Sequence, residues 1–187
     1  WLTAGLWLGL AGAASACTDR PFDQSAMAGS LVLSIAAQEG VVAAWYEAPT
    51  TRYPHGVLGD TVEAGTLAVQ IHAVPSCITA RIVLPEDQVF EDLAPRLADL
   101  NGDGIAEVVV VQSDARLGGK LAVYGLTPDG ADLILYAATP NVGRRNRWLA
   151  PIGIADLDSD GAIEIAYIDR PHLARTLRVW RFVPTGL

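Results

Sequence analysis

The sequence predicts an all-β fold, a partial β-propeller of about two to three blades in this chain. Three observations support this prediction. Short apolar runs with the period of strands follow one another from residue 41 onward. Turn residues separate these runs, and one segment recurs after a fixed interval. A fixed period with several short strands per unit is typical of propellers and similar arrays.

Composition limits the class of protein. The chain has 187 residues, of which 51% are hydrophobic, so it can bury a real core and is not a disordered chain. Its formal net charge of -8 argues against a general nucleic-acid binder, which would carry a basic field. We therefore expect no nucleic-acid partner.

Eight segments are predicted to be strands. Thr66–Ile71 and Ile78–Leu84 alternate as half-buried strands do. Val108–Val111 is β-branched throughout, which suits a strand buried on both faces. The remaining predicted strands are Val41–Tyr46, Leu121–Tyr124, Leu133–Tyr136, Ile163–Tyr167 and Leu177–Trp180. No long helical period appears after residue 40.

An internal repeat organises these strands. The segment Ala94–Gly104 returns as Ala150–Gly161, and Asp99 lies 57 residues before Asp156. A degenerate third copy is expected to start at Pro54–Asp60, without an acidic loop. The sequence thus predicts a repeat region over 41–187, divided into a degenerate blade at 41–90, an acidic-loop blade at 91–149 and an incomplete acidic-loop blade at 150–187.

The N-terminal segment has the features of an export signal. Residues 2–16 are uncharged and end in the small-x-small pattern of a cleavage site, so we interpret 1–16 as a signal peptide. Residues 17–40 are expected to be a linker that leads into the repeats. The expected location is extracytoplasmic, in the bacterial periplasm or at the cell surface.

Two interpretations of Cys17 remain open. The stretch Ala14–Cys17 is similar to a bacterial lipoprotein signal, in which the cysteine is acylated and anchors the protein in the membrane. Alternatively, Cys17 pairs with Cys77 in a disulfide, which export makes chemically reasonable.

Both copies of the repeat carry an acidic loop, Asp99–Glu107 and Asp156–Glu164, with oxygen-bearing side chains at loop positions 1, 3, 5 and 9. Glycine at position 6 permits a sharp reversal, and the backbone carbonyl at position 7 can supply a further oxygen. Hard oxygen donors in this number suit Ca²⁺. The predicted metal ligands are Asp99, Asn101, Asp103, Ile105 and Glu107 in the first loop, and Asp156, Asp158, Asp160, Ala162 and Glu164 in the second.

An EF-hand is excluded by two features of these loops. An EF-hand loop needs an acidic residue at position 12 and flanking helices. Position 12 is Val110 in the first loop and Tyr167 in the second, and the flanking segments are predicted strands.

The repeated Asp-x-Asp/Asn-x-Asp-Gly-x-x-Glu pattern, followed by an apolar strand, resembles the FG-GAP/VCBS repeats of integrin-α-like β-propellers. The resemblance covers roughly residues 90–185. It implies four-stranded blades, and it implies that both loops bind calcium through the positions named above. Asn101 and the glutamates at position 9 depart from the commoner aspartate. Because the second loop has four carboxylates against three, we expect it to bind Ca²⁺ more tightly.

The sequence predicts a non-enzymatic, calcium-stabilised interaction module whose partner is a protein or a polysaccharide. No known catalytic motif is present. The alternative is a propeller-based extracytoplasmic hydrolase with an unrecognised active site. Arginines gather near Trp148 and beyond the second loop. We interpret them as ordinary surface charge in preference to a patch for an anionic partner.

Overall fold

The computed structural model describes residues 17, 25–34, 39–73 and 76–183, and these form strands and connections only. The predicted signal peptide, 1–16, lies outside the described residues. The strands are β1 (Val32–Leu33), β2 (Gly40–Thr50), β3 (Glu63–Ala73), β4 (Ser76–Val83), β5 (Gln88–Phe90), β6 (Arg96–Ala98), β7 (Glu107–Asp114), β8 (Gly118–Leu126), β9 (Leu133–Ala138), β10 (Leu149–Ala155), β11 (Glu164–Asp169) and β12 (Thr176–Arg181). Within the described ranges, no helix is long and apolar enough to cross a membrane.

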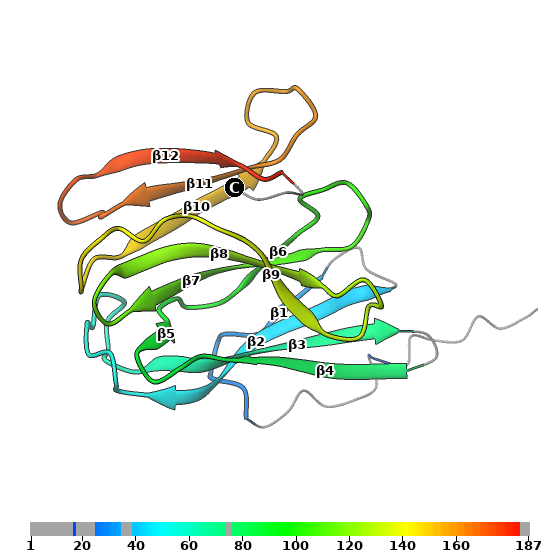
Figure 1. The fold of residues 1–187 in the computed structure, drawn as a ribbon, viewed down its shortest axis with the longest axis horizontal. Helices are drawn as coiled ribbons and strands as arrows, with labels where there is room; N and C mark the ends of the chain where they lie inside the picture. The colour runs from blue at the N-terminus through cyan, green and yellow to red at the C-terminus, as the bar shows by residue number, and fades with distance from the viewer. Residues whose placement is uncertain (1–16, 18–24, 35–38, 74–75, 184–187) are drawn as a thin grey trace, which may run out of the picture.

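The strands are stacked in three layers (Figure 1). The first layer contains β1–β4, the second contains β6–β9 and the third contains β10–β12. All described strand pairs are antiparallel. The short strand β5 pairs with both β3 and β7, so hydrogen bonds join the first two layers into one nine-stranded sheet. The side chains of the first two layers nevertheless pack face to face, in one core cluster.

The central strand β7 forms the middle of the core. Val108 and Val110 belong to the cluster shared with β2 and β3, whereas Val109 and Val111 belong to the cluster shared with β10, β11 and β12. All four side chains are fully buried. The prediction that this segment is buried on both faces is therefore confirmed, because layers cover it on both sides.

All eight predicted strand segments lie within or largely within observed strands, and the all-β class is confirmed. The sequence missed β1, β5, β6 and β10. The first three have only two or three residues each, too few to show a period. The strand β10 contains Pro151 and Gly153, with a register shift between them, and it pairs with β11 alone. Proline and glycine are tolerated in such an edge strand but weaken its sequence signal.

The N-terminal part of the repeat region differs from two sequence expectations. The segment Pro54–Asp60 lies in the connection from β2 to β3, which corresponds to the β7–β8 turn and not to an acidic loop. Within the expected linker, Val32 and Leu33 form β1 and pair with β2. Cys17 is joined to Cys77, in β4, by a disulfide.

Candidate metal centre

The two acidic loops occupy equivalent places in the second and third layers. The first connects β6 to the central strand β7, and the second connects β10 to the central strand β11. Ala98 pairs with Glu107, and Ala155 pairs with Glu164, so each strand ladder closes directly beside its loop. This pairing brings the carboxylate at position 9 back beside the aspartate at position 1.

Asp99 shapes the first loop. One carboxylate oxygen accepts the N–H of Gly102 at 2.7 Å, and the other accepts the N–H of Gly104 at 2.9 Å. Gly104 has a φ of 85°, in the left-handed region where glycine is favoured. The sharp reversal expected at position 6 is therefore present.

The other predicted side-chain ligands of the first loop converge on one another. The Asn101 amide nitrogen donates to Asp103 and to Glu107, at 3.0 Å in each case. Asp103 accepts the N–H of Ile105 at 2.7 Å, and Glu107 accepts the N–H of Leu100 at 2.8 Å. An amide group thus lies between two carboxylates. The carbonyl of Ile105 as a metal ligand remains a prediction.

Electrostatics at Glu107 favour a nearby cation. Burial raises the pKa of Glu107, the N–H of Leu100 lowers it, and the neighbouring carboxylates of Asp103 and Asp99 raise it, so that the resulting pKa is about 7. Like charges held close together disfavour ionisation. A divalent cation in this loop would remove that repulsion and keep Glu107 charged.

The second loop has the same backbone design. Asp156 accepts the N–H of Ser159 at 2.7 Å and that of Gly161 at 2.9 Å. Ser159 has a φ of 65° where the first loop has a glycine, and Gly161 has a φ of 91°. Asp160 accepts the N–H of Ala162 at 2.9 Å. Glu164 accepts the N–H of the residue at position 2, as Glu107 does.

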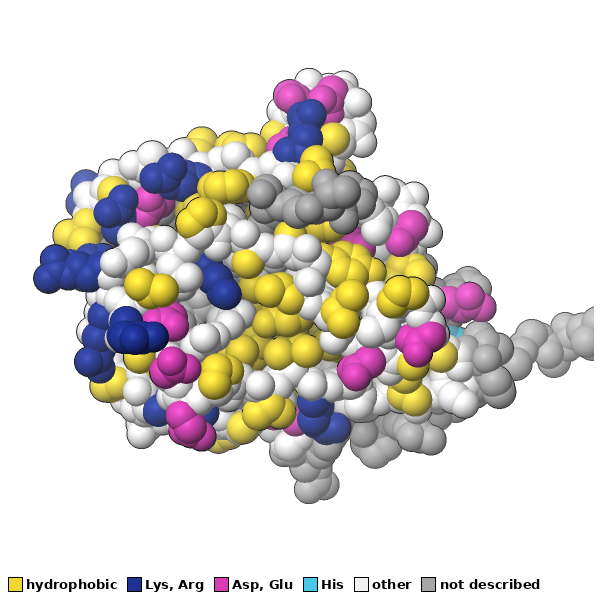
Figure 2. All heavy atoms as spheres, in the orientation of Figure 1, with side chains coloured by type: hydrophobic (Ala, Val, Ile, Leu, Met, Phe, Trp, Pro, Cys, Tyr) yellow, Lys and Arg dark blue, Asp and Glu magenta, His cyan; other side chains and the backbone are white. Residues whose placement is uncertain are grey.

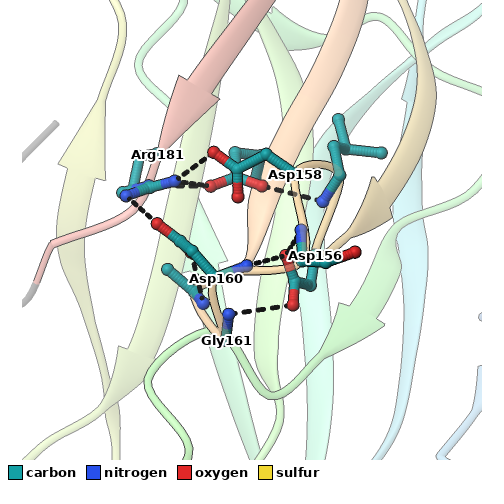
Figure 3. Close-up of polar contacts among 9 residues, drawn as sticks. Asp156, Asp158, Asp160, Gly161 and Arg181 are labelled. Atoms are coloured by element: carbon teal, nitrogen blue, oxygen red, sulfur yellow. Dashed lines mark hydrogen bonds and ion pairs between the residues drawn. The ribbon is translucent and has the colours of Figure 1, made fainter.

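Arg181, one of the arginines interpreted from the sequence as ordinary surface charge, lies against the second loop (Figure 3). Its guanidinium lies 2.6 Å from Glu164, 2.8 Å from Asp160 and 3.0 Å from Asp158. The hydrogen bond that Arg181 donates to Glu164 outweighs burial and raises the pKa of Arg181, with a further contribution from Asp160. The register of β11 and β12 explains this placement, because Glu164 pairs directly with Arg181.

The first loop has glycine at the corresponding cross-strand place. Val108 pairs with Tyr124, so the next residue along β8, Gly125, lies opposite Glu107. A side chain at Gly125 is excluded, because a Cβ there would lie 2.1 Å from the ring of Tyr136. The two loops therefore have the same backbone conformation. They differ because an arginine side chain, Arg181, lies against the second loop, whereas a glycine occupies the matching place at the first.

The donor set of the second loop fits calcium in spacing. One oxygen from each of Asp156, Asp158 and Glu164 lies within 4.8 Å of the others. Ligands at 2.3–2.6 Å from a calcium ion are separated by about 5 Å at most, so these oxygens can share one shell. In each loop the residue at position 7, Ile105 or Ala162, has its N–H held by the carboxylate at position 5.

A comparison with protein families matches residues 94–167 to the FG-GAP-like repeat. The matched segment contains both acidic loops and the strands β6–β10 between and around them. The resemblance to FG-GAP repeats that the loop pattern indicates is therefore confirmed over residues 94–167. Comparisons with curated proteins and with solved structures found no match.

Proposed function

We propose that this chain is an exported interaction module in which calcium stiffens the loops of a propeller-like repeat. An FG-GAP-like repeat indicates a binding or structural module. The observation that carries the calcium proposal is the shared geometry of the two loops. In each, an aspartate at position 1 shapes the turn and strand pairing returns a glutamate to its side.

The three stacked layers support a propeller-like arrangement of blades. Each layer has a central strand that pairs with the strand before it and the strand after it, in the orders β1-β2-β3, β6-β7-β8 and β10-β11-β12. The first two layers gain a fourth strand, β4 or β9. In this proposal the three layers are successive four-stranded blades, the third incomplete in this chain.

Calcium would act on structure in this proposal. Asp99, Asn101, Asp103 and Glu107, with the carbonyl of Ile105, would hold one ion. The second ion would be held by Asp156, Asp158, Asp160 and Glu164, with the carbonyl of Ala162. Each ion would tie the loop to the first residue of a buried central strand.

The disulfide supports the export part of the proposal. Disulfides persist in oxidising compartments outside the cytoplasm. A disulfide between Cys17 and Cys77 and a thioether-linked lipid on Cys17 are alternatives, because one sulfur cannot carry both. Outside the cytoplasm, millimolar calcium would fill even loops with dissociation constants of about 10⁻⁴–10⁻³ M.

Hydrolase activity is the weaker alternative. The residues that most resemble a catalytic set are the buried Ser113 and Glu91 and the half-buried His55. Ser113 and His55 each contact the Glu91 carboxylate, Ser113 as a hydroxyl donor and His55 through Nδ1. A nucleophile activated by a base would need the serine to donate to the histidine. The arrangement therefore favours a structural role for these residues.

Thermal unfolding with and without calcium tests the proposal. Calcium binds only the folded loops, so it stabilises the native state by mass action. We expect excess EDTA to lower the melting temperature by about 5–10 °C relative to millimolar calcium. A Glu86→Gln variant is the control, because this side chain is 95% exposed and lies far from both loops in sequence, so its calcium response should equal that of the wild type. Equal melting temperatures in calcium and in EDTA would contradict the proposal that calcium stabilises the fold.

A further inference from the structure

A cavity of about 230 Å³ opens at the ends of the strands opposite the acidic loops. Its walls come from the β2–β3 connection, the β9–β10 connection and the β11–β12 turn. Figure 2 shows basic side chains gathered at this end of the molecule, on the left, away from the acidic loop at the top. The polar and aromatic residues of the lining are His55, Asn146, Arg147, Trp148, Arg170 and His172.

One buried residue fixes two walls of this cavity. Glu91 is fully buried, and its carboxylate contacts Nδ1 of His55. Its backbone carbonyl accepts the indole N–H of Trp148 at 2.9 Å. Both rings are therefore held in place before any ligand arrives, and Nε2 of His55 is left for a ligand. Walls fixed in advance reduce the ordering cost of binding.

Asn146 supplies an unused acceptor to the lining. Its backbone N–H donates to the Tyr53 hydroxyl at 3.0 Å, and its φ of 52° places it in the left-handed region, which asparagine tolerates. Its side-chain oxygen is buried and has no hydrogen-bond donor among the described residues. This oxygen is shielded from solvent, so a ligand hydroxyl would satisfy it once the side chain turns toward the cavity.

Arg147 supplies an uncompensated charge. Its guanidinium donates to the carbonyl of Asn146 at 2.7 Å, and no carboxylate lies within 4.0 Å of it in the described part of the chain. Arg170 differs, because Asp169 already accepts two of its hydrogen bonds, at 2.7 and 3.0 Å. The lining therefore favours an anionic group at Arg147.

We propose that this cavity binds a uronate residue of an acidic polysaccharide. The sugar carboxylate pairs with Arg147, a sugar hydroxyl donates to Asn146, and the sugar ring lies against the Trp148 indole. This inference rests on the proposed interaction role and names the class of partner. A phosphodiester group fits the same cation, but it has no O–H and leaves the Asn146 oxygen without a donor.

Isothermal titration calorimetry of the calcium-loaded protein with trigalacturonate tests the inference. The wild type should bind trigalacturonate with millimolar or better affinity and should not bind neutral maltotriose. Arg147→Ala should weaken binding about tenfold, because a charged pair is lost. Asn146→Asp, which keeps the left-handed backbone accessible, should weaken it by a similar factor through charge repulsion.

Arg144→Ala is the matched control. Arg144 lies three residues before Arg147 and has the same charge, but its side chain is exposed and does not line the cavity. It should change the affinity less than about twofold, since exposed charges are screened by solvent. Equal losses in the Arg144 and Arg147 variants would overturn the site. Binding of inorganic phosphate without trigalacturonate binding would overturn the ligand class. Melting in calcium and EDTA, measured on the same samples, separates failure of this inference from failure of the calcium proposal.

Discussion

The aspartates at loop position 1 have a structural task that is independent of any metal. Asp99 and Asp156 each accept two or more backbone N–H groups, including the N–H of the glycine at position 6. Replacing either aspartate would remove hydrogen bonds that hold the loop conformation as well as a metal ligand. The carboxylates of Asp103 and Asp158 accept fewer hydrogen bonds from the loop backbone than those of Asp99 and Asp156. Substitutions of Asp103 and Asp158 therefore test metal binding more directly.

The sequence identified these loop residues because their spacing carries the information. Alternate acidic residues followed by glycine are enough to predict a turn that gathers oxygens. Arg181 was not identified, because nothing local in the sequence relates it to residues 158–164. Its place depends on the pairing of Glu164 with Arg181 across β11 and β12, which only the folded register defines.

Glu63 is a buried carboxyl group in the first layer and carries a pH prediction. It is 3% exposed, and burial together with the carboxylates of Glu91, Asp60 and Asp92 raises its pKa to about 8. The folded state therefore holds a proton that the unfolded state releases above its usual pKa of 4.5. Stability from this group is fully present below pH 4.5 and is lost as the pH rises toward 8.

We predict that Glu63→Gln flattens this loss. Between pH 5 and pH 8 the free energy of unfolding of the wild type, measured with urea, should fall by up to about 1.4 kcal/mol per pH unit because of Glu63, and the variant should lack this contribution.

Glu47→Gln is the contrasting variant. Burial raises the pKa of Glu47, but hydrogen bonds from Arg81, Ser25 and Trp45 lower it overall, so its loss should destabilise near neutral pH. Identical pH profiles for wild type and Glu63→Gln would show that Glu63 ionises normally in the fold.

At the scale of elements, strand length decided what the sequence could predict. Strands of six residues or more, such as β7 and β8, show enough period or β-branching to be recognised, except β10, whose Pro151 and Gly153 interrupt its pattern. The short strands β5 and β6 do not, although β5 joins two layers and β6 leads into the first acidic loop. Their pairing is imposed by packing of the central strands around them.

Strand β12 changes the expected ranking of the two calcium loops. The sequence ranked the second loop higher because it has four carboxylates. Arg181 contributes one positive charge beside three of them, so the net charge of that loop becomes similar to that of the first. Counting carboxylates no longer favours the second loop, and Ca²⁺ must compete there with a guanidinium.

We predict that Arg181→Gln raises the calcium affinity of the second loop about tenfold, because a like charge leaves the ligand cluster. Calcium titration should be done in an Asp103→Asn background, in which the first loop is weakened. Arg178→Gln is the matched control, since Arg178 lies on the same strand, has the same charge and pairs with Asp169 at the other end of β11. Unchanged or lower affinity after loss of Arg181 would show that the arginine does not compete with the ion.

At the scale of the whole molecule, the internal repeat predicted the spacing of successive layers along the sequence better than the residues at which each layer begins and ends. The interval between Asp99 and Asp156 matches the step from the second layer to the third. The first layer lacks an acidic loop to mark it, and the expected start of the third copy, 54–60, lies in the connection between β2 and β3. Long-range relations such as the double pairing of β5 and the cavity near Trp148 depend on packing and have no sequence period.

The arrangement places different chemistry at the two ends of the strands. The acidic loops precede the central strands β7 and β11, while the arginine-lined cavity lies where β11 ends and turns toward β12. In our account calcium stiffens one end and the other end contacts an acidic partner. Both roles require calcium to occupy the two loops.

The stoichiometry of calcium binding to the folded chain tests that claim most directly. Isothermal titration of metal-free wild type with Ca²⁺ should give two ions per chain. Asp103→Asn and Asp158→Asn should each lose about one ion, because each removes a charged ligand from one loop only. The double variant should bind none. A folded wild type that binds no calcium, or a double variant that still binds two ions, would contradict the account.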